Sequence, residues 1–428
     1  DVDLVPFPDL LSTIVDNRGK TCPTVGHGIP LIATNCVRND LLYPAYDKIR
    51  FVSEETYCSW FRGHPQPGDL IFVTKGTPGR VCVVPDPVGF CIAQDMVAVR
   101  VNPKKVYPKF LFAVLRSRDV QNQIEQMHVG TLIPHFKKGD FDKLLLPVPD
   151  RRMQELLGDC YFDFCAKIEL NRRMCRTLEG IARAIFQSWF VDFDPVRAKA
   201  AGAKRFRGMP QAVFGTLPAA FADSPLGPIP EGWAVQGLDE IASFLNGLAL
   251  QKYPPRDGRS LPVIKIAQLR AGHTTGADQA SADLDPAYVV TDGDVLFSWS
   301  GSLECVLWAG GQGALNQHLF KVTSERFPKW FFYFWIHRHL PHFRHIAAGK
   351  ATTMGHIQRH HLSEAKVAVP PGSVHEAADR LLAPLVAAIP QRMVQSRTLA
   401  AIRDALLPKL LSGELRIADA EKIVGRGV

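Results

Sequence analysis

Histidine is the residue type whose clustering first points to chemistry in this sequence. Imidazole nitrogens are common zinc ligands, usually alongside cysteine and at tight spacing. Only Cys305 lies in the same half of the chain, and no tight ligand pair precedes the histidines. The sequence therefore favours structural histidines, or histidines that face phosphate groups when partly protonated, and we expect no bound metal. The histidines of this cluster are His337, His339, His342, His345, His356, His360 and His361.

Motifs for catalysis are incomplete. Glu364-Ala365-Lys366 matches the tail of the Asp and Glu-x-Lys pattern of nucleases, but such tripeptides occur by chance. Tyr253-Pro254-Pro255 and Asn102-Pro103 do not fit the Asp/Asn-Pro-Pro-aromatic motif of an adenine methyltransferase. Gly349-Lys350 lacks the upstream glycine and the Ser/Thr of a phosphate-binding loop. We therefore expect no catalytic residues in this chain, and any methylation or translocation to belong to other chains.

A duplication reveals the elements that position the polar side chains. Similar segments recur in the same order, roughly 220 residues apart. The first copy has Gly-Asp-Leu-Ile-Phe at 68–72, Tyr-Pro-Lys-Phe at 107–110 and Arg-Thr-Leu-Glu at 176–179. The second has Gly-Asp-Val-Leu-Phe at 293–297, Phe-Pro-Lys-Trp at 327–330 and Arg-Thr-Leu-Ala at 397–400. Solenoid repeats have periods of roughly 20–50 residues, so this pattern indicates a duplicated domain and a duplicated helix.

Two similar heads are predicted at residues 1–150 and 233–371. Both contain short β-like runs that are separated by glycine and proline turns, together with a helical stretch. Residues 194–232 are rich in proline and alanine and are interpreted as a linker, and residues 419–428 as a tail.

A long helix follows each head. Residues 151–193 carry apolar side chains at helical spacing, and residues 372–418 repeat this stripe. Pro384 and Pro390 interrupt the second stripe, so this helix is expected to start late or to be kinked.

The fold class that follows is α+β, with two similar α/β heads separated by two long helices. Helices of this length need a partner along their length. The simplest partner for each is the other, in an antiparallel coiled coil that gives the chain pseudo-two-fold symmetry. Duplex DNA has two-fold axes of its own, so one chain could do the work of a symmetric dimer on two unlike half-sites.

Composition limits the partners and the compartment. The net charge is +8 and the pI is near 9.0, which is compatible with nucleic acid. The nine cysteines are odd in number and have no CxxC spacing, which indicates a reducing cytoplasm. Neither a signal pattern nor an apolar run of about 20 residues is seen, so no membrane association is expected. The chain begins at Asp1 and not at Met, so we expect that a few residues precede it.

One family shares several of these segments. Residues 171–199, which contain Ser-Trp-Phe-Val-Asp-Phe-Asp-Pro at 188–195, closely resemble the central conserved region of specificity subunits of type I restriction–modification systems. Residues 223–233 and 403–415 resemble the same family, and the resemblance covers nearly the whole chain.

The resemblance implies a role in host defence, with the heads as target recognition domains that each read half of a bipartite sequence in double-stranded DNA. The helices would fix the gap between the half-sites and dock two methyltransferase (modification) subunits, which restriction/translocase subunits would join. Cofactors would belong to those partners: S-adenosylmethionine to the methyltransferase, and ATP and Mg to the restriction subunit. The alternatives are a combined specificity/catalytic methyltransferase or nuclease, and a stand-alone DNA-binding regulator, which would not need two long partner-binding helices.

Loops at three places in each head are the candidate DNA contacts, because a rigid scaffold positions loops that read bases. Basic and hydroxyl side chains suit phosphates, and amides suit adenine. The competing interpretation is a solvated basic loop. In the first head the candidates are Lys75, Thr77, Arg80, Gln94, Thr131, His135, Lys137 and Lys138. In the second head they are Ser298, Ser300, Gln317, Lys350, Thr352, Thr353, His356, Arg359 and His360.

Two aromatic residues lie off the apolar stripe of the first long helix. Phe186 and Phe190 are therefore predicted to form a surface for a partner subunit.

Overall fold

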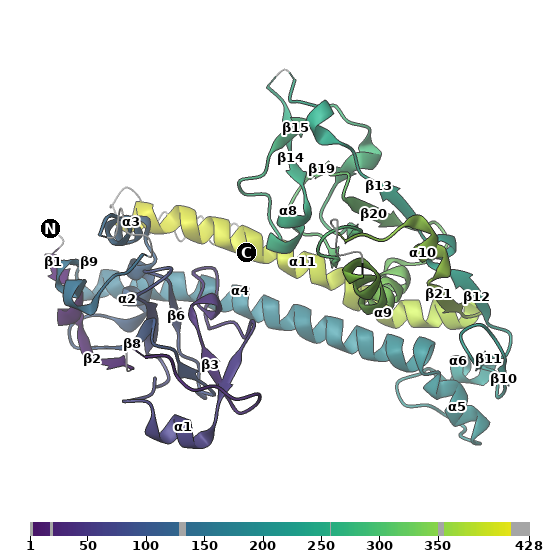
Figure 1. The fold of residues 1–428 in the computed structure, drawn as a ribbon, viewed down its shortest axis with the longest axis horizontal. Helices are drawn as coiled ribbons and strands as arrows, with labels where there is room; N and C mark the ends of the chain where they lie inside the picture. Colours follow the sequence, from purple (N-terminus) through teal and green to yellow (C-terminus); the bar gives the residue numbers. More distant parts are fainter. Residues whose placement is uncertain (1–2, 18–19, 128–133, 257, 350–354, 412–428) are drawn as a thin grey trace. The chain divides into compact units, whose positions relative to one another are not determined.

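The computed structural model describes residues 3–17, 20–127, 134–256, 258–349 and 355–411. The chain divides into two compact units (Figure 1). Unit 1 contains residues 1–170 and 398–428, and unit 2 contains residues 171–397. Each of the two long helices therefore contributes one part to unit 1 and another to unit 2.

Unit 1 contains the first head, which is built on two main sheets. The larger sheet is antiparallel in the order β2 (Leu11–Asp16), β8 (Met96–Val101), β5 (Leu70–Val73) and β6 (Val81–Val83). The smaller sheet has the order β4 (Arg50–Val52), β3 (Ile29–Ile32) and β7 (Cys91–Ile92), and β3 and β7 run parallel. A third pair joins β1 (Asp3–Pro6) to β9 (Leu145–Val148). The short helices are η1 (Phe7–Leu10), η2 (Thr34–Cys36), α1 (Glu54–Ser59), α2 (Pro108–Leu115), α3 (Arg118–Gln126) and η3 (Lys138–Lys143).

Unit 2 repeats this topology. Its antiparallel sheet has the order β13 (Ser243–Asn246), β20 (Leu319–Thr323), β17 (Val295–Ser298) and β18 (Cys305–Leu307). Its second sheet has the order β15 (Gln279–Ser281), β14 (Ser260–Ile264), β19 (Gly313–Leu315) and β16 (Val289–Val290), and β14 and β19 run parallel. β12 (Ala234–Gly237) pairs with β21 (Lys366–Val369) as β1 pairs with β9. The remaining elements of this head are α7 (Leu238–Ile241), η5 (Leu250–Lys252), α8 (Ile266–Ala271), η6 (Pro286–Tyr288), α9 (Lys329–Ala348) and α10 (Arg359–Glu364). The predicted duplication is confirmed in both sheets, with one difference: β16 is a fourth strand of the second sheet in unit 2, and the smaller sheet of unit 1 has no such strand among its described residues.

The repeated Gly-Asp motif has a structural role in both heads. Gly68 and Gly293 take positive φ angles (+83° and +92°) in the turn before the central strand, a conformation that glycine adopts without strain. In unit 1 the next residue, Asp69, is buried and accepts two hydrogen bonds from Arg100 on β8, both of 2.9 Å. In unit 2 Asp294 pairs with Lys321 on β20 at 3.1 Å. The motif therefore ties the start of one strand to a cation on its neighbour.

The long helices pack antiparallel within each unit. The first is α4 (Arg151–Phe186), continued by the π-helical turn η4 (Gln187–Val191), and the second is α11 (Gly372–Leu411). In unit 2 Asn171 Nδ2 donates to Gln395 Oε1 (2.9 Å), and four residues later the Cys175 thiol donates to the carbonyl of Ile389 (3.6 Å). Positions thus ascend on α4 as they descend on α11, as predicted. In unit 1 Leu399 and Leu406 of α11 enter the core that α4 shares with the first head.

The prediction that the second helix starts late is wrong. α11 begins at Gly372 and runs through Pro384 and Pro390. An interior proline costs a helix about 3 kcal/mol, but Leu382, Val386 and Ile389 are buried in the core of unit 2 on the same stretch. Fully burying such side chains contributes roughly 1.5–3 kcal/mol each, and this packing offsets the lost hydrogen bonds.

Residues 194–232, which are interpreted from the sequence as a linker, contain regular elements of their own. They form α5 (Asp194–Ala200), α6 (Gln211–Thr216) and the pair β10 (Phe221–Ala222) and β11 (Ile229–Pro230). Val196, Phe214 and Ile229 are buried in the core of unit 2. Proline and alanine content hid these widely spaced apolar side chains, each of which anchors a short element.

Candidate nucleic-acid interface

Main-chain hydrogen bonds bring the three predicted stretches of the first head together. Lys75 and His135 form an antiparallel bridge between the first and third stretches. On either side of it, the N–H of Gly76 donates to the carbonyl of Pro134 (2.9 Å), and that of Phe136 to Thr74 (2.8 Å). The second stretch joins through the carbonyl of Asp95, which accepts the N–H groups of Thr74 (3.0 Å) and Lys75 (3.2 Å).

The second head has the same three-way junction. Ser300 and His356 form the bridge. The N–H of Gly301 donates to the carbonyl of Gly355 (2.8 Å), and that of Ile357 donates to Trp299 (2.9 Å). The N–H of Trp299 donates in turn to the carbonyl of His318 (3.3 Å).

The two junctions correspond position by position. Lys75 corresponds to Ser300, His135 to His356, and Asp95 to His318. We call the two places the first junction and the second junction. Sequence spacing placed the six stretches on separate loops, and the hydrogen-bond pattern gathers them into one edge in each head.

The first junction carries lysines at its surface. Lys75, His135, Lys137 and Lys138 are exposed, and Arg80 and Gln94 are half-buried. Lys138 Nζ pairs with Asp16 Oδ2 at 2.5 Å, a partner that the sequence did not indicate. The Thr77 hydroxyl is buried and has no hydrogen-bond partner among the described residues, so it does not face solvent.

The second junction is built differently, around an indole. Trp299 Nε1 donates to Asn246 Oδ1 (2.9 Å) and to the carbonyl of Gln317 (3.1 Å). The Trp299 ring packs near those of Phe320, His318 and His356, with centroids 5.8–6.3 Å apart. Asn246 comes from the end of β13 and carries no signal in the sequence that links it to this place.

Two serines predicted to touch DNA are buried at the second junction. Ser298 is fully buried and its hydroxyl donates to the carbonyl of Ser302 (2.6 Å). Ser300 is 3% exposed, and its Oγ lies 3.0 Å from His318 Nδ1. The structure therefore contradicts direct contacts from these two hydroxyls, because both are used inside the loop.

The remaining candidates of the second head are accessible. Gln317 and His356 are half-buried, and Arg359 and His360 are exposed. The Arg359 guanidinium lies 5.6 Å from the centre of the Phe320 ring, which holds it against the sheet.

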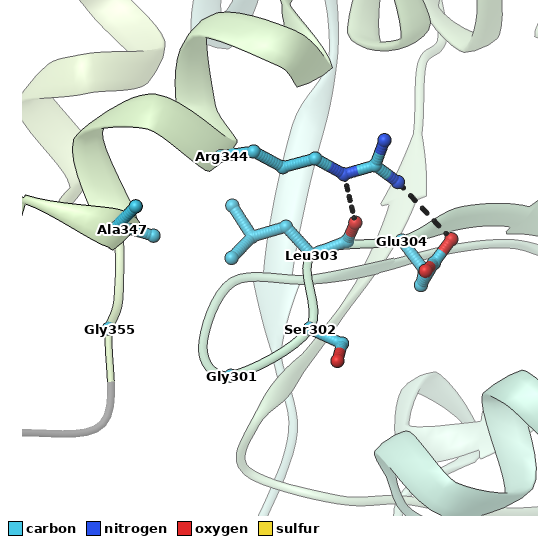
Figure 2. Close-up of a pocket in the computed structure, with 8 residues that line it drawn as sticks. Gly301, Ser302, Leu303, Glu304, Arg344, Ala347 and Gly355 are labelled. Carbon is cyan, nitrogen blue, oxygen red and sulfur yellow. Dashed lines mark hydrogen bonds and ion pairs between the residues drawn. The ribbon is translucent and has the colours of Figure 1, made fainter. Parts of the chain in front are cut away.

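A hollow of about 490 Å³ borders the second junction (Figure 2). Its walls include Gly301, Leu303 and Gly355, with Arg344 reaching across from α9. Arg344 Nε donates to the carbonyl of Leu303 (3.0 Å), and its Nη2 lies 3.4 Å from Glu304 Oε2. Nothing in the sequence singles out Arg344, because its role depends on how α9 packs against the β17–β18 loop.

Comparison with known proteins identifies the heads. The family model described as the type I restriction modification DNA specificity domain matches the chain twice, at residues 26–179 and 230–381. The chain belongs to this family. The two matches fall on the two heads, each with the start of the long helix that follows it, so the duplicated unit of the sequence is the domain of the family.

Curated members of the specificity-subunit family are similar over most of their length. The HindI specificity subunit of Haemophilus influenzae is 22% identical over 399 residues, which cover 81% of this chain and 86% of that protein. The MjaIX specificity subunit of Methanocaldococcus jannaschii is 22% identical over 356 residues, covering 78% and 76%. The crystal structure of an S subunit from M. genitalium has the same fold, with a TM-score of 0.56 and 14% identity over 96% of both chains. This chain is a specificity subunit of a type I restriction–modification system.

Two histidines of this specificity subunit are structural. His337 and His339 lie on α9, and burial lowers the pKa of each to about 4, so both imidazoles are neutral near pH 7. His339 Nε2 lies 2.9 Å from the carbonyl of Lys366, which fixes the ring. These positions fit the structural interpretation made from the sequence.

Within the described ranges, one group of side chains could share a metal ion. Ligand atoms of His360, His361 and Glu364 lie within 4.8 Å of one another. His361 Nδ1 already accepts the N–H of Gln358 (2.9 Å), and His360 and Glu364 are exposed. In the part of the chain that the structure describes, no helix is long and apolar enough to cross a membrane.

The partner surface predicted at Phe186 and Phe190 is wrong. The two side chains are 2% and 0% exposed. Phe186 packs on Trp335 (centroids 5.2 Å apart) and Phe190 on Trp330 (5.4 Å), both from α9. The prediction considered only the two long helices, and α9 covers the face that they leave open.

Four of the predicted DNA-contact residues, Thr131, Lys350, Thr352 and Thr353, lie outside the described residues.

Proposed function

We propose that this specificity subunit reads a bipartite sequence in double-stranded DNA, with one half-site read by each head. The observation that carries the proposal is the repeated junction. The same main-chain bonds gather three loops in both heads, whereas the side chains they present differ. Backbone positioning with variable side chains is how one scaffold reads unlike base sequences.

We further propose that the chain itself is not catalytic and works in the cytoplasm. Its long helices dock two methyltransferase subunits and set the gap between the half-sites, and restriction/translocase subunits join this core. The partner methyltransferase uses S-adenosylmethionine, and the restriction subunit uses ATP and Mg. The incomplete catalytic motifs of the sequence support this division of labour. The nine free cysteines support a reducing compartment such as the cytoplasm.

The first test is a methylation assay on genomic DNA, with the chain alone, the methyltransferase subunit alone and the two together. We expect methyl transfer only from the combination, and only at one bipartite motif. Methylation by the purified chain alone would refute the proposal. A methyltransferase variant with an inactivated active site is the control, since it keeps the complex but removes the chemistry.

The second test exchanges residues 233–371 for the corresponding head of a relative with another specificity. We expect one half of the methylated motif to change and the other to stay. A change in both halves would contradict the assignment of one half-site to each head.

The third test inserts one helical turn near residue 170, together with a matching turn in α11. Because a helix rises about 1.5 Å per residue, the insertion lengthens the helix pair by one pitch. We expect the gap between the half-sites to lengthen while both half-sites stay the same. An unchanged gap would contradict the role of the helices as a spacer.

A further inference from the structure

Unit 1 contains a hollow of about 470 Å³ that is rich in arginine. Arg116 and Arg118 enter it from the end of α2 and the start of α3, Tyr161 from α4, and Arg403 from α11. Asp40 and Asp404 also line it. We call this place the basic hollow. Its volume lies in the range of small-molecule sites, roughly 300–1,000 Å³.

The acidic side chains of the basic hollow are already matched by cations. Asp40 accepts two hydrogen bonds from Arg38, of 2.9 and 2.6 Å. Asp404 Oδ1 accepts one from Arg403 Nε at 2.8 Å. No further acidic residue in the lining balances the charges of Arg116 and Arg118, so the hollow has a net positive charge.

Arg116 is buried with unused hydrogen-bonding capacity. The side chain is 9% exposed, and its Nε donates to the carbonyl of Val81 (3.0 Å) while Nη2 donates to that of Leu41. Its Nη1 is buried and makes no hydrogen bond of normal geometry among the described residues. The guanidinium lies 4.2 Å from the centre of the Phe112 ring and close enough to Tyr161 to oppose the rise in the pKa of that phenol. A buried donor without a partner costs about 1–3 kcal/mol, and more when it is charged.

Arg403 and Tyr161 complete the site. Arg403 is 7% exposed, and its guanidinium lies 5.4 Å from the centre of the Tyr161 ring. Burial raises the pKa of the Tyr161 phenol and the charges of Arg116 and Arg403 oppose that rise, so the phenol is a neutral donor near pH 7.

In unit 2 the three buried polar side chains of this place have apolar counterparts, whereas the exposed Arg118 and Asp404 align at the same offsets with Arg338 (338 − 118 = 220) and Arg183 (404 − 183 = 221). The duplication aligns Arg116 with Ile336, Tyr161 with Leu382 and Arg403 with Ala182, at offsets of 220, 221 and 221 residues (336 − 116, 382 − 161 and 403 − 182). All three counterparts are 0% exposed and belong to one apolar core. The fold therefore does not require arginine at these buried positions. Buried charges can often be replaced by apolar residues at no loss of stability, so the arginines of unit 1 need another reason.

We propose that the basic hollow binds an oxyanion, the phosphate or carboxylate group of a small molecule. Guanidinium groups hold both kinds of group through paired N–H donors. Arg118 and Arg403 bind the oxyanion directly, and the Tyr161 hydroxyl donates a hydrogen bond to it. Buried Arg116 adds positive charge to the site. None of the residues that line the basic hollow belongs to the first junction, and the proposal does not depend on the proposed reading of DNA.

The test titrates the full chain with inorganic phosphate and, separately, with acetate, at constant ionic strength, and follows binding by calorimetry. We expect saturable binding of at least one of them, and the pair of titrations tells phosphate from carboxylate. Arg118→Gln should weaken binding about tenfold, since a hydrogen bond to a charged group contributes about 1.5–3 kcal/mol. Arg152→Gln, which removes another exposed arginine of unit 1 outside the hollow, should change the affinity less than about twofold.

Arg403→Ala places in unit 1 the residue that unit 2 has at this position, and it should also weaken binding about tenfold. Its urea unfolding midpoint, measured beside that of the wild type, tells a lost site from a lost fold. Absence of saturable binding for both anions, or equal affinities for Arg118→Gln and Arg152→Gln, would overturn the proposal.

Discussion

The first and second junctions have the same backbone and different chemistry. In both heads an isolated bridge joins the loop after the central strand to the loop before the last strand, and a third carbonyl completes the junction. On this frame the first head presents exposed lysines, whereas the second holds an indole, a buried hydroxyl and histidines in a hydrogen-bonded cluster. The difference shows that the fold specifies where side chains stand but not which ones they are.

The two units also differ in which ionisable side chains they bury. Unit 1 buries the Asp69 carboxylate, which pairs with half-buried Arg100, and it buries Arg116 and Arg403. Unit 2 buries neutral histidines on α9. The two halves should therefore respond differently to acid, to salt and to single substitutions.

Acid should separate the units most strongly. Burial lowers the pKa of His337 and His339 to about 4, so their contribution to the stability of unit 2 is complete above their ordinary pKa of about 6.5 and is lost as the pH falls toward 4. We expect unit 2 to lose about 3 kcal/mol of unfolding free energy between pH 7.5 and 5.5. Tryptophan fluorescence in urea measures this, since Trp189, Trp233, Trp299, Trp308, Trp330 and Trp335 lie in unit 2 and Trp60 in unit 1.

The control for the acid effect is His337→Phe, which stays neutral at every pH. It should retain about half of the pH dependence. Equal unfolding midpoints for the wild type at pH 7.5 and 5.5 would contradict the assignment.

Removing the indole should damage the second junction far more than an equivalent change in the first. Trp299→Ala deletes two hydrogen bonds and the ring that orders His318 and His356, and we expect a loss of about 2 kcal/mol in the stability of unit 2. Binding to the methylated motif should weaken at least tenfold by filter binding. Thr74→Ala at the equivalent position is the comparison and should cost about 0.5–1 kcal/mol. If both variants lost the same affinity, the indole would not organise the second junction.

The Gly-Asp motif allows a matched test of buried charge. Asp69→Asn removes the charge of a buried carboxylate and replaces one of the two oxygens that accept from Arg100 with an NH2 donor, whereas Asp294→Asn removes the charge that pairs with Lys321. We expect Asp69→Asn to cost about 1.5 kcal/mol more than Asp294→Asn in urea unfolding. The opposite order would show that the two pairs do not have the same role.

The smallest expected difference between the two junctions is in the salt dependence of DNA affinity, which reports contacts to phosphate groups. Lys75→Ala removes an exposed charge of the first junction, and Ser300→Ala removes a neutral buried hydroxyl at the equivalent position. We expect the slope of log affinity against log salt to fall by about 1 for Lys75→Ala and to stay unchanged for Ser300→Ala. Equal slopes for the two variants would mean that Lys75 makes no phosphate contact.

Much of this architecture follows from the sequence because the duplication is visible in it. The Gly-Asp strand, the Pro-Lys helix start and the Arg-Thr-Leu stripe mark equivalent elements, and the structure pairs them with the same topology. The accessible lysines of the first junction could be selected because charge next to a glycine turn after a strand predicts an exposed loop.

What escaped prediction depends on packing between distant segments. Phe186 lies off the stripe of its own helix, and only the aromatic face of α9 shows that it is buried. Asn246 and Arg344 serve the second junction from β13 and α9, far from it in sequence. Residue type alone cannot tell a hydroxyl that faces a ligand from one that bonds a carbonyl within its own loop, as Ser298 does.

The bridges that build the two junctions use only main-chain N–H and carbonyl groups. A substitution at position 75, 135, 300 or 356 therefore leaves these main-chain bonds in place, provided that the new residue is not proline. New specificities can then arise one substitution at a time, without passing through an intermediate that fails to fold. Each head can also acquire substitutions independently of the other. The number of recognition sequences available to such a chain is then the product of the numbers of variants of its two heads.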